Sequence, residues 1–236
     1  MRVVIAGGRG RLGRRLAPAL ADAGHCVYAP TRSAVDWADP AQAYRAVESA
    51  DLLIHAAAYT DVIRAQSEPA KCIHDTVGTI EGALRALVRS KARMLYISTD
   101  YVLPLLRGDH GAGVYAAAKL VAEQRVIHAQ GGIHFVCRTA FVTPEQADRW
   151  SWVDGYTRSN RLWVDQLVPL LVAKAEEIHN RSQVDQVFNL GSARPHTLAS
   201  MLADRYPNHR ALQAIITGPD QLPPSTNRFR PVDTSW

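Results

Sequence analysis

The sequence predicts an α/β fold in which helices cover both faces of a doubly wound parallel sheet. Short apolar runs alternate with longer amphipathic segments, the pattern of strands joined by crossover helices. A glycine-rich turn directly follows the first apolar run. The 236 residues suffice for one such domain with a sizeable core and are too few for two full domains.

The first half of the chain contains four apolar runs of strand length. They predict strands at Arg2–Ala6, His25–Ala29, Asp51–Ala56 and Arg93–Ser98. The amphipathic segments between them predict helices at Leu12–Ala23, after Asp39 and at Pro69–Ser90. The second of these helices has a clear start, because Asp39 is a good N-cap and Pro40 fits the first turn.

The second half continues the alternation. It predicts strands at Ile133–Arg138 and Gln186–Leu190, and helices at Val114–Gln130, Trp163–His179 and Leu198–Tyr206. Gly131 and Gly132 end the first of these helices, because glycine adopts the left-handed conformation that commonly terminates a helix. The proline-rich tail from Gly218 to Trp236 is expected to be extended.

Composition narrows the class of protein. The chain is 47% hydrophobic and 21% charged, which argues against disorder. No apolar run reaches the roughly 18 residues that a membrane span needs. The start of the chain runs straight into glycines without a signal-peptide cleavage pattern. Cys26, Cys72 and Cys137 lack the paired spacing of a metal site, so we expect reduced thiols in a cytoplasmic protein with no metal.

The net charge is +5 and the pI is about 9.3, which favours binding of anions. Recognition of nucleic acid needs basic residues clustered beside aromatic ones, and most arginines here are scattered. The exceptions flank the glycine-rich turn: Arg9, Arg11, Arg14 and Arg15. We therefore expect a small phosphate-bearing ligand, and neither nucleic acid nor a membrane as partner.

The glycine-rich turn has glycines at positions 7, 10 and 13, between a predicted strand and a predicted helix. Gly7, Gly10 and Gly13 allow a tight turn and close approach of the backbone to a pyrophosphate. The N-terminus of the next helix then offers free N–H groups to that anion. The context predicts a Rossmann dinucleotide site, although glycines in such turns also serve packing alone.

The segment after the second strand indicates which dinucleotide binds. A carboxylate there would hold the ribose hydroxyls of NAD, whereas an arginine accommodates the 2′-phosphate of NADP. Residues 29–33 contain Arg32, and no acid occurs before Asp36. The sequence therefore favours NADP, with NAD as the second candidate. The alternative is that Arg32 is only a solvated loop residue.

A tyrosine and a lysine stand four positions apart in a predicted helix, so they share one face. An ammonium at Lys119 would favour the phenolate of Tyr115 and so help it to exchange protons. Thr99 ends the fourth strand, where a hydroxyl can hold a substrate oxygen. The alternative is a core tyrosine beside a surface lysine, but the order along the chain favours a catalytic set.

Three segments carry a resemblance to a known family. Residues 54–62 read IHAAAYTDV, residues 98–102 read STDYV, and residues 115–123 read YAAAKLVAE. Over about its first 140 residues the chain resembles extended short-chain dehydrogenases/reductases, closest to the dTDP-4-dehydrorhamnose reductase family. That family reduces the 4-keto group of a dTDP-deoxysugar by hydride transfer from NADPH or NADH.

The resemblance implies a division of the chain. Residues 1–140 would form the NAD(P)-binding Rossmann core. Residues 141–236 would form a mixed region, in which a small substrate lobe is joined by a late strand and helices that complete the core. It also implies a homodimer packed through the helices near 69–90 and 114–130. Small residues such as Ala116–Ala118 fit a contact between helices of one chain equally well.

The resemblance also implies roles for single residues. The pyrophosphate would be covered by Gly10, Arg11 and Leu12. Other cofactor contacts would be made by Asp36, Trp37, Ala57, Ala58, Tyr59 and Lys119. The catalytic set would be Thr99, Tyr115 and Lys119. Substrate contacts would be made by Asp100 and by Phe141, which replaces a tryptophan of the family.

The chain departs from the family in two places that bear on function. Only fifteen residues separate Thr99 from Tyr115, fewer than in the family, so the sugar site is trimmed. Asp75 stands where the family usually has asparagine. The sequence therefore favours an NADP-dependent carbonyl reductase, with a 4-keto deoxysugar nucleotide as the expected substrate. The alternatives are a nucleotide-sugar epimerase or dehydratase, and a non-catalytic dinucleotide-binding regulatory subunit.

Overall fold

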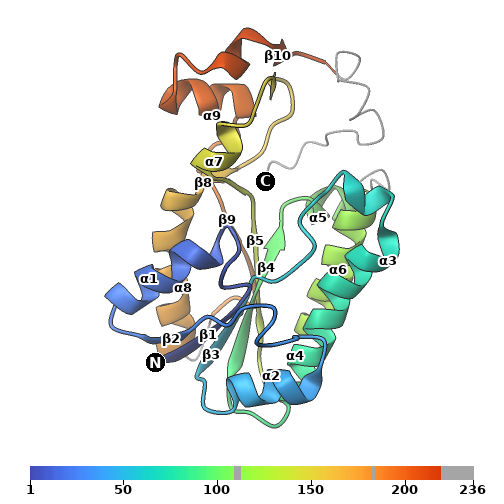
Figure 1. The fold of residues 1–236 in the computed structure, drawn as a ribbon, viewed down its shortest axis with the longest axis vertical. Helices are drawn as coiled ribbons and strands as arrows, with labels where there is room; N and C mark the ends of the chain where they lie inside the picture. The colour runs from blue at the N-terminus through green and yellow to red at the C-terminus, as the bar shows by residue number, and fades with distance from the viewer. Residues whose placement is uncertain (109–112, 182–183, 219–236) are drawn as a thin grey trace.

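The computed structural model describes residues 1–108, 113–181 and 184–218. Its centre is a six-stranded sheet in the order β2-β1-β3-β4-β5-β9, with every neighbouring pair parallel. The strands are β1 (Arg2–Ala6), β2 (Cys26–Tyr28), β3 (Leu52–His55), β4 (Arg93–Thr99), β5 (Phe135–Thr139) and β9 (Val187–Leu190). The predicted α/β fold with a doubly wound parallel sheet is confirmed (Figure 1).

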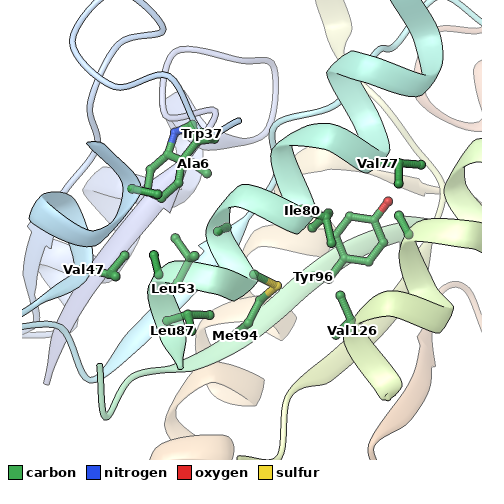
Figure 2. Packing of buried hydrophobic residues seen from close by; sticks show 14 of the residues in the cluster. Ala6, Trp37, Val47, Leu53, Val77, Ile80, Leu87, Met94, Tyr96 and Val126 are labelled. Atoms are coloured by element: carbon green, nitrogen blue, oxygen red, sulfur yellow. The ribbon is translucent and has the colours of Figure 1, made fainter. Parts of the chain in front are cut away.

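Helices cover both faces of the sheet, as Figure 1 shows. One face carries α1 (Gly13–Asp22) and α8 (Val164–Asn180), and the other carries α2 (Pro40–Val47), α4 (Thr79–Leu87) and α6 (Gly113–Ile127). Successive residues of a strand point to opposite faces. Accordingly Ile5 packs in the core under α1 and α8, while Ala6 packs in the core under α2, α4 and α6. Figure 2 shows the second core, with Leu53 and Tyr96 at its centre.

The chain reverses its direction of winding between β1 and β3. Strand β1 pairs with β2 on one side and with β3 on the other, where Ala6 lies opposite His55. In open α/β sheets, ligands bind in the crevice outside the carboxyl ends of the strands at such a switch point. The glycine-rich turn after β1 therefore lies where a ligand is expected.

The helix predicted at Pro69–Ser90 has three parts. It begins as α3 (Pro69–Ile73), continues as a π-helical turn (His74–Gly78), and ends as α4. The π turn buries Asp75, Thr76 and Val77. Turns of this type are frequent at functional sites. Hydrophobic spacing predicted the position of the helical stretch but not the π turn, because the extra residue leaves only a small change in the apolar pattern.

A small lobe lies beyond the carboxyl ends of the strands (Figure 1). Its elements are β6 (Phe141–Val142), α7 (Pro144–Ala147), β7 (Val153–Asp154), β8 (Leu162–Trp163), α9 (Leu198–Arg205) and β10 (Ile215–Ile216). It has its own apolar core, formed by Val142, Ala147, Val153, Trp163, Ala199, Met201, Leu202 and Ala211. The tail at 219–236, part of the region predicted as mixed, lies outside the described residues.

Three short helical segments complete the described fold. Helix α5 (Val102–Leu106) follows β4 directly, and 3-10 turns lie at Arg64–Gln66 and Arg210–Gln213. Helix α5 was not predicted, because five residues with Pro104 among them carry no helical period. It occupies part of the connection between Thr99 and Tyr115, which therefore contains a structured turn beside the carboxyl end of β4.

Candidate active site

The glycine-rich turn is packed so closely that larger residues would not fit. Gly7 has a positive φ of +82°, and its carbonyl accepts a hydrogen bond from the Gly10 amide at 2.9 Å. A Cβ on Gly7 would lie 2.8 Å from the backbone nitrogen of Ala57, and one on Gly13 would overlap the Gly7 carbonyl oxygen. The turn is thus a bare backbone cradle that opens into the N-terminus of α1, a geometry suited to a phosphate group.

A cavity of about 420 Å³ runs from this cradle along the carboxyl ends of β1, β3, β4 and β5. On the side of the sheet it is lined by Gly7, Gly10, Arg11, Leu12, Gly13, Ala58, Thr99, Tyr115 and Lys119. On the side of the lobe it is lined by Phe141, Val142, Gln146, Trp150, Trp152, Asp154, Arg161 and Leu198. The cavity therefore connects the predicted pyrophosphate site with the predicted catalytic residues.

The structure brings the three predicted catalytic side chains together. Thr99 lies at the end of β4, and its hydroxyl is close enough to Tyr115 on α6 to influence the pKa of that phenol. One helical turn further, the ammonium of Lys119 donates a hydrogen bond to the Ile97 carbonyl at 2.7 Å. The same nitrogen lies 4.4 Å from the centre of the Tyr96 ring. All three predicted catalytic side chains line the cavity.

Burial acts in opposite directions on the two titratable groups of this set. It raises the pKa of the Tyr115 phenol, as do Tyr101 and Asp100, whereas the polar side chain of Thr99 lowers it. The net effect is a pKa above the ordinary value. Burial also lowers the pKa of Lys119 to about 7, against the opposing influence of Glu123. A phenol that stays protonated near neutral pH is suited to giving a proton.

A buried carboxylate fixes the rotation of α6. Glu123 accepts a hydrogen bond from the Ser98 hydroxyl at 2.5 Å and three from Arg138, the shortest at 2.7 Å. It is fully buried and lies one turn beyond Lys119 on the same helix face. Sequence reasoning gave Glu123 no role, although a lone acid on the face of a catalytic lysine was a signal that could have indicated one.

The residues predicted to bind the adenosine end of the cofactor are Arg32, Asp36 and Trp37, and they differ in exposure and in hydrogen bonding. The Arg32 guanidinium forms an ion pair with Asp75, at 2.8 Å, although the Arg32 side chain is 77% exposed. Asp36 is exposed, and its carboxylate accepts the Ala38 amide. The ring of Trp37 is buried in the core, 6.0 Å from the ring of His55. Burial of the large apolar surface of an indole stabilises the fold.

The residues after β3 are only partly at the cavity. Ala58 lines it, whereas the backbone of Ala57 packs against Gly7. The Tyr59 hydroxyl donates a hydrogen bond to Glu68 at 2.8 Å, and burial together with Glu68 raises the Tyr59 pKa to about 12. Ala57 and Tyr59 therefore pack behind the residues that line the cavity and do not line it themselves.

The two predicted substrate residues differ in position. Phe141 lines the cavity from β6. Asp100 is fully buried and accepts a hydrogen bond from the Thr99 hydroxyl at 3.3 Å. It stands behind Thr99, and its negative charge is one of the influences that raise the Tyr115 pKa.

Apart from Phe141, sequence reasoning missed the residues on the lobe side of the cavity. Trp150, Trp152, Asp154 and Arg161 all line it, and they come from a stretch with little regular secondary structure. The only sequence signal was two tryptophans in a polar segment. Arg161 also lowers the pKa of Tyr101, against the effect of burial, so the lobe acts on the catalytic end of the cavity.

The part of the chain that the structure describes contains neither a metal-binding cluster nor a membrane-spanning helix. No group of three or more histidine, cysteine, aspartate and glutamate side chains there is arranged to hold a metal ion. Among the helices of residues 1–108, 113–181 and 184–218, none combines the length and the apolar character of a membrane span.

The sequence is similar to that of a known protein family. A family model described as the RmlD substrate binding domain matches residues 1–151. The dTDP-4-dehydrorhamnose reductase of Mycobacterium tuberculosis is 37% identical over 143 residues, which cover 54% of this chain and 46% of that protein. The chain thus spans about half the length of the curated relatives it matches.

Solved structures share the fold over nearly the whole chain. The dTDP-4-dehydrorhamnose reductase from Bacillus anthracis, crystallised in complex with NADP, has a TM-score of 0.78 at 19% identity and covers 99% of this chain and 88% of its own. An NAD-dependent NDP-hexosamine 5,6-dehydratase of tunicamycin biosynthesis has a TM-score of 0.70 at 18% identity, with coverage of 91% and 82%. One fold therefore accommodates both reductases and dehydratases.

Proposed function

The chain belongs to the family described as the RmlD substrate binding domain, and on that basis we propose that it is an NADP-dependent oxidoreductase that reduces a carbonyl group. Its proposed substrate is a 4-keto deoxysugar nucleotide, in line with relatives named dTDP-4-dehydrorhamnose reductase. The observation that carries the proposal is the single cavity that joins the glycine cradle to Thr99, Tyr115 and Lys119.

The proposed reaction divides its tasks among residues of this cavity. A bound reduced nicotinamide dinucleotide supplies the hydride. The backbone of the turn around Gly10 and the N-terminus of α1 bind its pyrophosphate. The Thr99 hydroxyl orients the substrate carbonyl oxygen, and Tyr115 gives that oxygen a proton. Lys119 holds the ribose next to the nicotinamide and adds a positive charge beside Tyr115 when it is protonated.

The protonation state of Tyr115 supports reduction as the direction of chemistry. Reduction of a carbonyl consumes a proton, which the neutral phenol can give. Burial and the neighbouring Tyr101 and Asp100 raise the pKa of Tyr115, so the phenol keeps its proton near neutral pH. The trimmed connection between Thr99 and Tyr115 does not separate the two side chains, which line the same cavity.

NADP is the proposed cofactor, with NAD as the alternative. Support comes from the positively charged side chains of Arg32 and Lys71, which lie together after β2 and β3. A dianionic 2′-phosphate prefers such surroundings, and a guanidinium can bind it bidentately. Structural neighbours crystallised with NADP or NADPH point to the same choice.

Two other functions are the alternatives to a reductase. A nucleotide-sugar epimerase or dehydratase would use the same fold and catalytic set, and a dehydratase is among the structural neighbours. Such an enzyme regenerates its cofactor and would retain it through purification, whereas a reductase exchanges it. A non-catalytic regulatory subunit would have no need for a proton donor in the same cavity as Thr99 and Lys119.

We also propose a homodimer in the cytoplasm. Ile73 on α3 and Val121 on α6 are 50% and 46% exposed, which offers an apolar surface on the helices expected to pair. Ala116 and Ala118 are buried within the chain itself, so they do not contribute to that surface. Sedimentation at two protein concentrations would test the pairing. Three free thiols suit a reducing compartment.

The decisive experiment is a screen of nucleotide sugars. The purified protein is mixed with NADPH and each 4-keto sugar nucleotide in turn, oxidation of NADPH is followed by absorbance, and the product is identified by mass spectrometry and NMR. We expect stoichiometric NADPH oxidation with a 4-hydroxy product. Turnover of a nucleotide sugar without net NADPH consumption would instead identify an epimerase or dehydratase.

A further inference from the structure

A single carboxylate on the π turn holds three nitrogen-bearing side chains. One oxygen of Asp75 accepts from Arg32 at 2.8 Å and lies 3.2 Å from a ring nitrogen of His74. The other oxygen accepts from the ammonium of Lys71 at 2.7 Å. Only 10% of the Asp75 side chain is exposed, so this carboxylate is fixed in place while its partners reach it from the surface.

The position of this cluster follows from the order of the strands. Arg32 lies in the loop after β2, and Asp75 lies on the helical stretch after β3. Strand β1 runs between β2 and β3 and ends in the glycine cradle. The Arg32–Asp75 ion pair therefore joins the two segments that flank the cradle on its adenosine side. No other predicted cofactor residue among those the structure describes takes part in such a bridge.

We propose that Asp75 sets the cofactor preference of this chain, by holding Arg32 in an ion pair that the 2′-phosphate of NADPH must displace. This inference rests on the proposed NADP-dependent function and identifies the residue that tunes it. In this arrangement Asp75 is an internal competitor: its carboxylate and the 2′-phosphate are both anions that bind the same guanidinium. Asp75 acts through Arg32 and is a positioning residue rather than a catalytic one.

The exposure of Arg32 and Asp75 explains why Arg32 can exchange its carboxylate partner for a phosphate. An ion pair with an exposed member is weak, since water competes for its charges. Arg32 is 77% exposed, so it can leave Asp75 for a ligand anion without burying an unpaired charge of its own. Asp75 keeps Lys71 and His74 as partners when Arg32 leaves, so its buried carboxylate stays compensated. NADH has no 2′-phosphate, and its binding leaves the pair intact.

The test substitutes Asp75→Asn, which keeps the size of the side chain and removes its charge. Adenosine 2′,5′-bisphosphate and 5′-AMP serve as probes, titrated by calorimetry, because they report on the adenosine end without requiring turnover. NADPH and NADH are titrated in parallel by nicotinamide fluorescence. We expect the Kd of the bisphosphate and of NADPH to fall by roughly three- to fivefold, the upper part of the range for one exposed charge pair. The Kd of 5′-AMP and of NADH should change by less than about twofold.

A double variant separates competition from other effects. In an Arg32→Ala background, Asp75→Asn should no longer tighten NADPH by more than about twofold, because there is no guanidinium left to release.

The outcomes are distinct. Equal binding of the bisphosphate by the wild type and Asp75→Asn overturns the inference while leaving the proposed function standing, and so does weaker binding by Asp75→Asn. An equal gain with and without Arg32 shows a general field effect and also overturns it. Failure of the wild type to bind either dinucleotide overturns the proposed function and, with it, this inference.

Discussion

Tyr115 and Lys119 illustrate how one environment gives two neighbouring residues different chemistry. Burial keeps the phenol of Tyr115 protonated and brings the ammonium of Lys119 close to losing its proton. The sequence predicted that the two residues share a helix face with Thr99 nearby, since helical spacing fixes that relation. It could not predict the hydrogen bond from Lys119 to Ile97, because that contact depends on how closely α6 lies against β4.

The first prediction concerns the hydroxyl of Tyr115. Replacing Tyr115 by Phe should lower turnover by roughly 10²-fold or more, the scale of a lost general acid, and leave NADPH affinity almost unchanged. Tyr101→Phe is the matched control, because Tyr101 lines the same cavity and its ring lies 6.1 Å from that of Tyr115. We expect a much smaller loss in the control. Turnover of Tyr115→Phe close to that of the wild type would contradict the assignment of the proton donor.

The second prediction concerns stability and pH. Burial lowers the Lys119 pKa from 10.5 to about 7, so between these values the unfolded chain binds a proton that the folded chain has lost. The free energy of unfolding should therefore rise with pH across this window, by up to about 1.4 kcal/mol per unit from this residue. Below pH 7 both states are protonated and the contribution no longer changes.

Chemical denaturation of the wild type and Lys119→Met measures this effect, because other titrating groups are common to both proteins. Between about pH 7.5 and about pH 9, the stability difference between wild type and variant should shift in favour of the wild type by roughly 2 kcal/mol. A parallel pH dependence in the two proteins would mean that Lys119 stays protonated in the folded chain.

At the scale of elements, each of the six predicted strands overlaps a strand of the sheet, and their order gives the switch point where the glycine turn lies. Apolar runs and turn residues encode those strands locally. The π turn within the helical stretch after β3 is not encoded in this way. It is set by the packing of that stretch against the rest of the molecule, where Asp75, Thr76 and Val77 are all buried.

The third prediction concerns the helical stretch that contains this turn. A Cβ on Gly82 would overlap the backbone carbonyl of Trp37 and lie 2.8 Å from the Ala38 carbonyl carbon. Backbone atoms cannot move aside cheaply, so Gly82→Ala should lower the free energy of unfolding by about 1–3 kcal/mol. Gly78→Ala is the control, since its Cβ would meet nothing closer than the His74 ring at 3.8 Å.

We expect Gly78→Ala to stay within about 1 kcal/mol of the wild type or to be slightly more stable, because alanine restricts the unfolded chain. Thermal and urea unfolding of both variants would show the contrast. Equal stability of the two variants would indicate that α4 and the loop at Trp37 can separate without cost.

At the scale of the whole molecule, the lobe decides which ligands reach the catalytic end of the cavity. Trp150, Trp152 and Arg161 approach it from this side. Sequence reasoning predicted that a lobe follows the core and, of its cavity residues, only Phe141. The others lie on short strands and irregular segments, which carry no periodicity. On the side of the core, Tyr101 from the connection between Thr99 and Tyr115 lines the cavity near the catalytic end.

The fourth prediction concerns substrate size. The short connection between Thr99 and Tyr115 leaves less chain to cover a bulky ligand, so the site is either unusually open or adapted to a smaller one. We expect the KM for dTDP-4-dehydrorhamnose to be about tenfold above that of the Mycobacterium tuberculosis relative measured in parallel, with kcat less affected. Equal KM values would show that the missing chain is dispensable.

The way the lobe is assembled also determines where the chain can be truncated. Its apolar core is assembled from two stretches separated in sequence by α8 and β9: Val142 and Trp163 come before them, and Met201 and Leu202 come after. A truncation after Leu190 would keep all six strands of the sheet yet strip half of the lobe, leaving the ring of Trp163 uncovered. Such a fragment should aggregate although its sheet is complete. A graft of the lobe onto another protein would for the same reason have to carry both stretches together with the helix and strand between them.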